Sequence, residues 1–155
     1  MKSILKLIGC ILLTMSIGGL SGYATLDGVT GWYTTLHKPA FNPPNYLFGP
    51  VWSLLYLLMG VSLFLILKAE KSPARSKAIA AFTIQLVLNF FWSIIFFRFH
   101  AVGIALAEIV LMWVAILRMI VAFYRVNRTA SLIQIPYIAW VSFAAILNAA
   151  IFYLN

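Results

Sequence analysis

Five long apolar runs constrain the fold of this chain more than any other feature of its sequence. They span residues 4–24, 46–67, 78–97, 101–124 and 130–154, so each contains 20 to 25 residues. A helix needs about 20 apolar residues to cross a hydrocarbon core of about 30 Å, whereas membrane strands are shorter and alternate in polarity. The five runs do not alternate. We therefore expect an all-α integral membrane protein, with a five-transmembrane-helix bundle as a single domain over residues 1–155.

The composition excludes most other classes of protein. Hydrophobic residues make up 64% of the chain, against about 45–50% in soluble domains, and this much apolar surface cannot be hidden in a small soluble globule. The same proportion excludes a disordered chain. Cys10 is the only cysteine, which excludes a disulfide scaffold, and with only His37 and His100 we expect no metal site.

The net charge of +8 is explained by membrane topology. A basic soluble protein would suggest nucleic acid as a partner, but here the basic residues lie between apolar runs, so we expect contacts with anionic lipid headgroups and no nucleic acid. With five spans, one side of the membrane receives Lys2, Lys6, Lys68, Lys71, Arg75, Lys77, Arg118, Arg125 and Arg128, and the other receives Lys38 and Arg98. Because basic loops stay inside, we expect the N-terminus in the cytoplasm, the C-terminus outside, and the bacterial cytoplasmic membrane as the location.

The first run has two interpretations. Lys2 and Lys6 before an apolar stretch that ends at Ser21-Gly22-Tyr23-Ala24 resemble a cleavable signal peptide. The run is longer than a usual signal core, and Gly18, Gly19 and Gly22 suit close packing between helices. We therefore expect a retained helix.

The first predicted loop, residues 25–45, is stiff and aromatic. It contains Trp32, Tyr33, Lys38, Pro39, Phe41, Pro43 and Pro44. Prolines in tandem cannot continue a helix and hold the preceding residue extended. The aromatic residues fit an interfacial belt, where tryptophan and tyrosine gather, or a lid over a cavity between the helices.

Three predicted helices carry aromatic stripes, two of them with amide side chains. At helical spacing the faces are Trp52, Tyr56, Met59 and Leu63 on the second, Gln85, Asn89, Trp92 and Phe96 on the third, and Tyr137, Trp140, Ala144 and Asn148 on the fifth. Amides are costly against lipid, so these faces point inward. They serve either interhelical hydrogen bonding or an aromatic pocket for a flat apolar ligand.

The sequence contains none of the common catalytic motifs for which we searched. Glu108 is an isolated acid in the fourth run, on one face with Met112 and Met119, and we expect it to face protein, to lie near the interface or to be protonated. No nucleotide-binding loop, nucleophile elbow or H-E-x-x-H motif occurs in the sequence. Hydrolytic catalysis therefore has no support.

Several motifs together resemble the TspO/MBR family, which includes the tryptophan-rich sensory proteins and the translocator protein once called the peripheral benzodiazepine receptor. The motifs are the segment 32–44 (WYTTLHKPAFNPP), Phe48-Gly49-Pro50-Val51-Trp52, Gln85-Leu86 with Asn89 and Trp92, and Pro136-Tyr137 with Trp140, Ala144 and Asn148. They stand in the family's order on a five-span plan, from Trp32 to Asn148.

This resemblance implies a homodimer of five-helix bundles with a pocket beneath the first loop. Family members bind porphyrins such as protoporphyrin IX and haem, and some also bind benzodiazepines. The ligand-binding positions implied here are Tyr33, Pro44, Trp52, Asn89, Trp140 and Ala144. The aromatic stripes add Tyr56, Trp92 and Asn148, and Trp32, Lys38, Pro39 and Pro43 are expected in the lid. No cofactor is expected beyond porphyrin as a ligand. The sterol motif of animal members is not matched, because only Leu154 and Asn155 follow Tyr153.

Three functions remain open from the sequence. The first is a porphyrin receptor or carrier for sensing, sequestration or transport. The second, implied by some bacterial relatives, is an enzyme that degrades protoporphyrin IX with light and oxygen, with Trp52 and Trp140 as the candidate catalytic residues. The third is a regulatory membrane protein that binds a protein partner and has no small ligand.

Overall fold

The structure is a computed structural model that describes residues 2–155, and side chains from residue 3 onward. Helices account for nearly all of the described chain, and no strand occurs in it. In order they are α1 (Lys2–Asp27), the π-helix η1 (Gly28–Trp32), α2 (Tyr33–Thr35), the 3-10 helix η2 (Asn45–Leu47), α3 (Phe48–Lys68), α4 (Pro73–Ser93), the π-helix η3 (Ile94–Arg98), α5 (Val102–Tyr124), α6 (Arg128–Leu132) and α7 (Ile135–Leu154).

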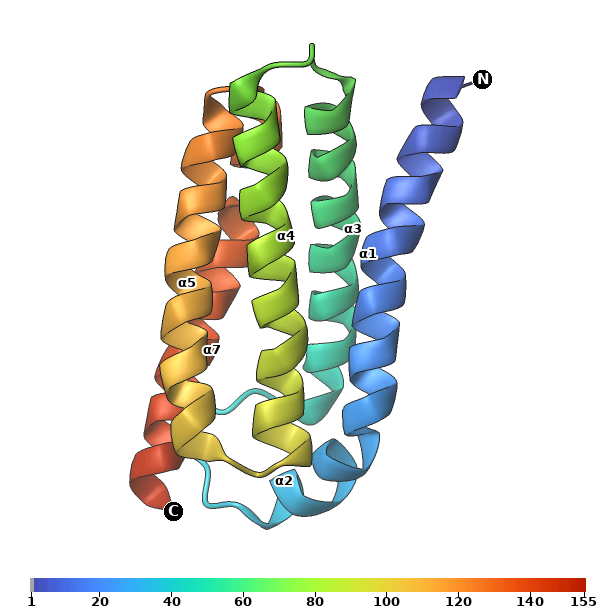
Figure 1. Ribbon diagram of the computed structural model, residues 1–155. Coiled ribbons are helices and arrows are strands. Elements are labelled where there is room, and N and C mark those ends of the chain that lie inside the picture. Colours follow the sequence, from blue (N-terminus) through green and yellow to red (C-terminus); the bar gives the residue numbers. More distant parts are fainter. Residues whose placement is uncertain (1) are drawn as a thin grey trace.

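Five helical stretches are long and apolar enough to cross a membrane: Ser3–Thr35, Asn45–Lys68, Pro73–Arg98, Val102–Tyr124 and Arg128–Leu154. They form one up-and-down bundle, with α1 at one edge beside α3 and with α7 behind α5 (Figure 1). The two chain ends lie at opposite ends of the bundle (Figure 1). The expected all-α, five-helix membrane fold is confirmed.

The first helix continues well beyond its predicted end at residue 24. It runs on through η1 and α2 as far as Thr35, so the predicted loop 25–45 is non-helical only over residues 36–44. The apolar run ends early because threonines follow it, but their hydroxyls donate to carbonyls within the helix. Thr25 Oγ1 lies 2.8 Å from Ser21 O, and Thr35 Oγ1 lies 2.7 Å from Trp32 O. The polar threonine side chains therefore find hydrogen-bond partners within the helix, which can continue beyond the apolar stretch.

Local capping sets the boundaries of the later helices. The Ser72 hydroxyl accepts a hydrogen bond from the Arg75 amide at 3.1 Å, directly before Pro73 at the start of α4. Asn127 Oδ1 accepts one from the Ala130 amide at 2.9 Å and caps α6. These are ordinary N-cap contacts, which use amides that the helix leaves unpaired. The tight turn into α5 is made by His100, whose φ is +56°.

The core lies between α3, α4, α5 and α7 and is filled by flexible and branched side chains. Met59, Ile109, Met112, Ile116 and Met119 are completely buried. Helix α1 contributes little to this core, and most of its leucines and isoleucines are exposed on the outer surface. Since lipid is as apolar as these side chains, an exposed leucine surface on α1 is expected in a bilayer.

Close backbone contacts hold α1 in place at two glycines. A Cβ on Gly60 in α3 would lie 2.7 Å from Ile11 Cα, and one on Gly28 would lie 1.8 Å from the carbonyl oxygen of Phe97. Near the first contact, Thr14 Oγ1 donates to Tyr56 O at 2.7 Å. Small residues let membrane helices approach closely, and a hydroxyl then adds an interhelical hydrogen bond.

Candidate ligand-binding site

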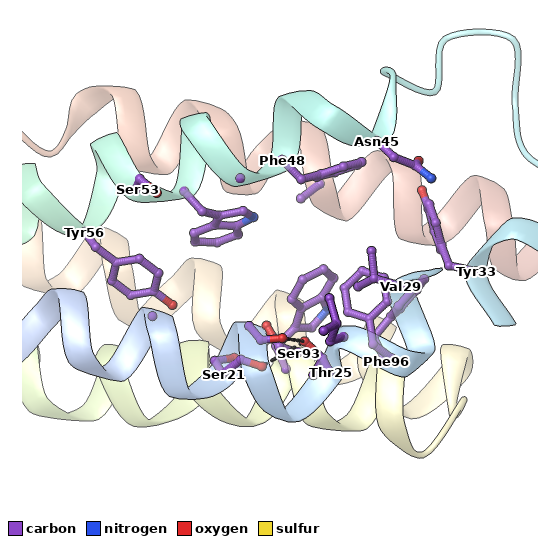
Figure 2. A pocket seen from close by; sticks show the side chains of 18 of the residues that line it. Ser21, Thr25, Val29, Tyr33, Asn45, Phe48, Ser53, Tyr56, Ser93 and Phe96 are labelled. Carbon is purple, nitrogen blue, oxygen red and sulfur yellow. Dashed lines mark hydrogen bonds between the residues drawn. The ribbon is translucent and has the colours of Figure 1, made fainter. Parts of the chain in front are cut away.

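A cavity of about 410 Å³ lies between α1, α3, η3 and α7. Figure 2 shows it from close by, with Tyr56 and Ser53 at its inner end and Tyr33 and Asn45 at the other, which we call the mouth. Aromatic rings make up much of its lining: Tyr33, Phe48, Trp52, Tyr56, Trp92, Phe96, Phe97 and Trp140. A cavity of this size and character suits a small molecule of drug size.

The structure brings together most of the residues singled out from the sequence. Tyr33, Trp52, Tyr56, Trp92, Trp140, Ala144 and Asn148 all line the cavity. Pro44 and Asn89 do not line it. Pro44 is exposed directly before η2, next to Asn45, which does line the cavity.

Asn89 lies behind the cavity wall and affects the cavity only through the side chains to which it is hydrogen-bonded. Its Oδ1 accepts a hydrogen bond from Tyr56 OH at 2.5 Å, and its Nδ2 donates to Tyr137 OH at 2.9 Å. Tyr137 OH in turn donates to Gln85 Oε1 at 2.8 Å. This buried chain of hydrogen bonds joins α3, α4 and α7, and it fixes the Tyr56 ring at the inner end of the cavity. The amide of Asn89 is therefore used inside the protein.

The Trp92 ring is held in a similar way. Its Nε1 donates to Asn148 Oδ1 at 3.2 Å, while Asn148 Nδ2 donates to Val102 O at 3.0 Å. The ring stacks on Phe96, with centroids 5.5 Å apart. The inward-facing amides thus hydrogen-bond helices to one another and, through these bonds, orient the Tyr56 and Trp92 rings on the cavity wall.

The loop 36–44, the predicted lid, is tied down by hydrogen bonds at both ends. His37 and Asn155 exchange two hydrogen bonds, of 3.0 and 2.9 Å, which attach the loop to the end of α7. Tyr33 OH donates to Asn42 Oδ1 at 2.7 Å, and Lys38 Nζ donates to Tyr33 O at 2.8 Å. The loop therefore holds Tyr33, which is almost completely buried, across the mouth.

The other predicted lid residues, Trp32, Pro39 and Pro43, pack against neighbouring residues or shape the loop. Trp32 lies in η1 and not in the loop, and its ring stacks on His100 with centroids 4.2 Å apart, outside Phe96. Pro39 O accepts from the Asn42 amide at 2.9 Å, and Pro43 O accepts from Asn42 Nδ2 at 3.0 Å. These contacts shape the turn that presents Asn42 to Tyr33.

Two buried polar atoms of the cavity lining have no hydrogen-bond partner among the described residues. They are Ser21 Oγ on α1 and Trp140 Nε1 on α7. A buried donor without a partner is costly. Both atoms belong to residues that line the cavity.

The wall formed by α1 was not predicted from the sequence. Gly18, Ser21, Gly22 and Thr25 of α1 line the cavity, followed by Val29 of η1, although the glycines were interpreted only as helix-packing residues. Gly18 does pack closely, since a Cβ there would lie 2.4 Å from the Tyr56 ring. Gly22 has nothing within 4 Å of an added Cβ, so it leaves open space. The spacing of glycine, serine and threonine on one helical face is the signal that could have indicated this wall.

Glu108 faces protein, as one of the three expectations had it. The residue is 8% exposed and stands on the α5 face with the buried Met112, and neither carboxylate oxygen has a hydrogen-bond partner in the described chain. It does not line the cavity. Trp113, off that face, donates to Ser142 Oγ at 2.8 Å and packs α5 on α7.

Comparison with known proteins agrees with this geometry. The profile of the TspO/MBR family matches residues 10–154. The chain belongs to the TspO/MBR family. It is 41% identical to the tryptophan-rich protein TspO of Chlorobaculum tepidum over 155 residues, covering 99% of this chain and 98% of that protein. It is 41% identical to the tryptophan-rich protein TspO of Archaeoglobus fulgidus over 154 residues, covering 99% of each chain.

An animal relative matches over a shorter stretch. The human translocator protein is 38% identical over 120 residues, which cover 76% of this chain and 70% of that protein. Family membership and the five apolar helices together establish an integral, multi-pass membrane protein.

Proposed function

We propose that this protein is a membrane receptor or carrier for a flat, apolar ring system, with a porphyrin such as protoporphyrin IX or haem as the first candidate. The observation that carries the proposal is the cavity of about 410 Å³ with Trp52, Trp92 and Trp140 on its walls. Indole rings bind flat ligands well, because stacking rewards contact area and needs few hydrogen bonds. Sensing or transport is favoured by the names of two relatives, a tryptophan-rich sensory protein and a translocator protein.

Polar atoms of the lining suit the few polar groups of such a ligand. Ser21 Oγ and Trp140 Nε1 supply two hydrogen-bonding atoms without protein partners. Lys38 is placed over the Tyr33 ring, 4.7 Å from its centroid, and so brings a positive charge to the mouth. A porphyrin with its ring between the indoles would direct its acidic side chains toward Lys38.

A titration with protoporphyrin IX in the dark tests the proposal, followed by quenching of tryptophan fluorescence in detergent. We expect saturable quenching by the wild type. In Trp140→Ala we expect a Kd higher by about tenfold or more, because a buried aromatic face contributes at least about 1.5 kcal/mol.

The matched control for this titration is Trp113→Phe, which removes a tryptophan that packs α5 on α7 outside the cavity. Its Kd should equal that of the wild type. Equal and non-saturating quenching in all three proteins would show that the porphyrin only partitions into detergent. Family membership would then predict the fold of this protein and not its ligand.

A second variant blocks the cavity without removing any ring. Gly22→Leu adds a side chain where nothing lies within 4 Å of the new Cβ, so we expect the fold to persist and porphyrin affinity to fall by about tenfold or more. Gly9→Leu is the control, since Gly9 also has open space but lies outside this cavity. Equal porphyrin affinity in both variants would argue against binding between α1 and α7.

Degradation of protoporphyrin IX with light and oxygen is the second candidate function. It is favoured by Trp52 and Trp140 lining one cavity, where both could contact a bound photosensitiser. The test is illumination of the purified complex in air. Loss of the Soret band with a new product, absent in the dark and reduced in Trp140→Ala, would establish an enzyme, whereas stable binding in light would exclude it.

The third candidate function is a regulatory membrane protein without a small ligand. It predicts no saturable porphyrin binding at all.

Orientation and assembly belong to the same proposal. The end of the bundle that carries Lys6, Lys68, Lys71, Arg75, Lys77, Arg118, Arg125 and Arg128, which we call the basic end, should face the cytoplasm of a bacterial cell, with the chain in the cytoplasmic membrane. The mouth of the cavity would then open toward the outside. A homodimer is expected from the family resemblance. Labelling of single cysteines at each end in intact cells tests the orientation, and light scattering in detergent tests the dimer.

A further inference from the structure

A second hollow lies at the basic end of the bundle, and it shares no lining residue with the aromatic cavity. It has a volume of about 320 Å³ and lies between α1, α3 and the start of α4. Its lining consists of two basic residues, Lys6 and Arg75, and of Gly9, Cys10, Leu13, Leu63 and Leu67. In Figure 1, α1 diverges from α3 toward its N-terminus at this end. We call this hollow the basic groove.

The lining of the basic groove is ordered from charged to apolar along the membrane normal. Along α1, Lys6 is nearest the helix start and Leu13 is seven residues deeper, about 10 Å at 1.5 Å per residue. Along α3, which runs the other way, Leu67 is next to the helix end and Leu63 is one turn deeper. A phospholipid has the same order, since its phosphate lies at the interface and its acyl chain points to the centre of the bilayer.

The positive charge in the groove is poorly neutralised by the protein. Arg75 Nη2 donates to Leu67 O at 3.1 Å, at the end of α3, while the buried Nε has no partner among the described residues. The chain has only three acids, Asp27, Glu70 and Glu108, and only Glu70 is near the basic end. An anion that contacts both cations would supply the missing counter-charge, and guanidinium groups suit phosphate oxygens.

Access to the groove comes from the lipid side. Leu13 is half exposed, and an added Cβ at Gly9 would meet nothing within 4 Å, so the outer wall of the groove has room for a chain. The basic residues attract anionic headgroups to this interface, and basic hollows between membrane helices bind such headgroups.

We propose that the basic groove binds one anionic phospholipid of the surrounding leaflet, with its phosphate between Lys6 and Arg75 and an acyl chain along Leu13 and Leu63. The lipid is a structural ligand that bridges α1, α3 and the start of α4 at the basic end. This site does not depend on the identity of the ligand in the aromatic cavity.

Native mass spectrometry of the purified protein in detergent tests the proposal, with phosphatidylglycerol and phosphatidylcholine of identical chains as probes. We expect the wild type to retain one phosphatidylglycerol with an affinity at least fivefold above that for phosphatidylcholine. Arg75→Gln should abolish this preference. Lys71→Gln removes an exposed charge from the same end but outside the groove, and it should retain the preference.

Gly9→Leu separates a built site from a general attraction to charge. It fills the groove while Lys6 and Arg75 remain, so we expect at least a fivefold loss of phosphatidylglycerol affinity, while Gly22→Leu on the same helix should bind like the wild type. Thermal unfolding confirms that each variant is folded. Equal losses in Lys71→Gln and Arg75→Gln, unchanged binding in Gly9→Leu, or equal retention of both lipids would overturn the proposal. Displacement of the lipid by excess inorganic phosphate would overturn it as well, because the site would then be one for the free ion.

Discussion

Gly28→Ala is expected to lower the free energy of unfolding by about 3 kcal/mol, at the upper end of the range for overpacked sites. The added Cβ would lie 1.8 Å from the carbonyl oxygen of Phe97 and 2.7 Å from its carbonyl carbon. Both atoms belong to backbone, so no side-chain rotation can relieve the contact. The π-helices η1 and η3 would have to move apart, and Tyr33 and Phe97, which line the cavity, would move with them.

The midpoint of thermal unfolding in a single detergent, followed by circular dichroism, measures this effect. Gly31→Ala is the matched control, because Gly31 lies in the same π-helix, has no positive φ and has nothing within 4 Å of an added Cβ. Its midpoint should be unchanged or slightly higher, since alanine is the better helix former. Equal midpoints for the two variants would show that η1 and η3 do not meet as closely as described.

Tyr137→Phe is expected to destabilise the protein by about 2 kcal/mol, more than the average of about 0.6 kcal/mol for one hydrogen bond in a membrane protein. The Tyr137 hydroxyl accepts from Asn89 Nδ2 and donates to Gln85 Oε1, and the ring is 1% exposed. Its removal leaves two buried amide atoms, Asn89 Nδ2 and Gln85 Oε1, without a hydrogen-bond partner. Tyr56, which depends on Asn89 for its own hydrogen bond, should also lose its fixed position in the cavity.

Thermal unfolding again measures the change, with Tyr153→Phe as control because the Tyr153 side chain is 89% exposed. A double-mutant cycle of Tyr137→Phe with Gln85→Leu gives the coupling between the two residues, which should exceed about 0.5 kcal/mol for direct partners. A coupling near zero, or equal midpoints for Tyr137→Phe and Tyr153→Phe, would refute the buried hydrogen-bond chain.

Much of the candidate site could be predicted because helical spacing alone decides which residues share a face. Gln85, Asn89, Trp92 and Phe96 were placed on one inward face, and all four are buried. Spacing does not tell which inward residue meets a cavity and which meets another helix. Asn89 and Trp92 are three residues apart on one face, yet only Trp92 lines the cavity, because the Tyr56 hydroxyl approaches Asn89 from α3.

The sequence by itself determined the class of the protein and the number of its spans, because the length and apolarity of a run are local properties that a bilayer selects directly. It also indicated the inward faces and the aromatic character of the site. Only the tertiary structure decided that the first helical stretch continues through η1 and α2 to Thr35, that Gly28 meets the Phe97 backbone, and that α1 forms one wall of the cavity. These features depend on how closely two helices far apart in the chain approach one another. That distance is set by packing between them, which no local pattern contains.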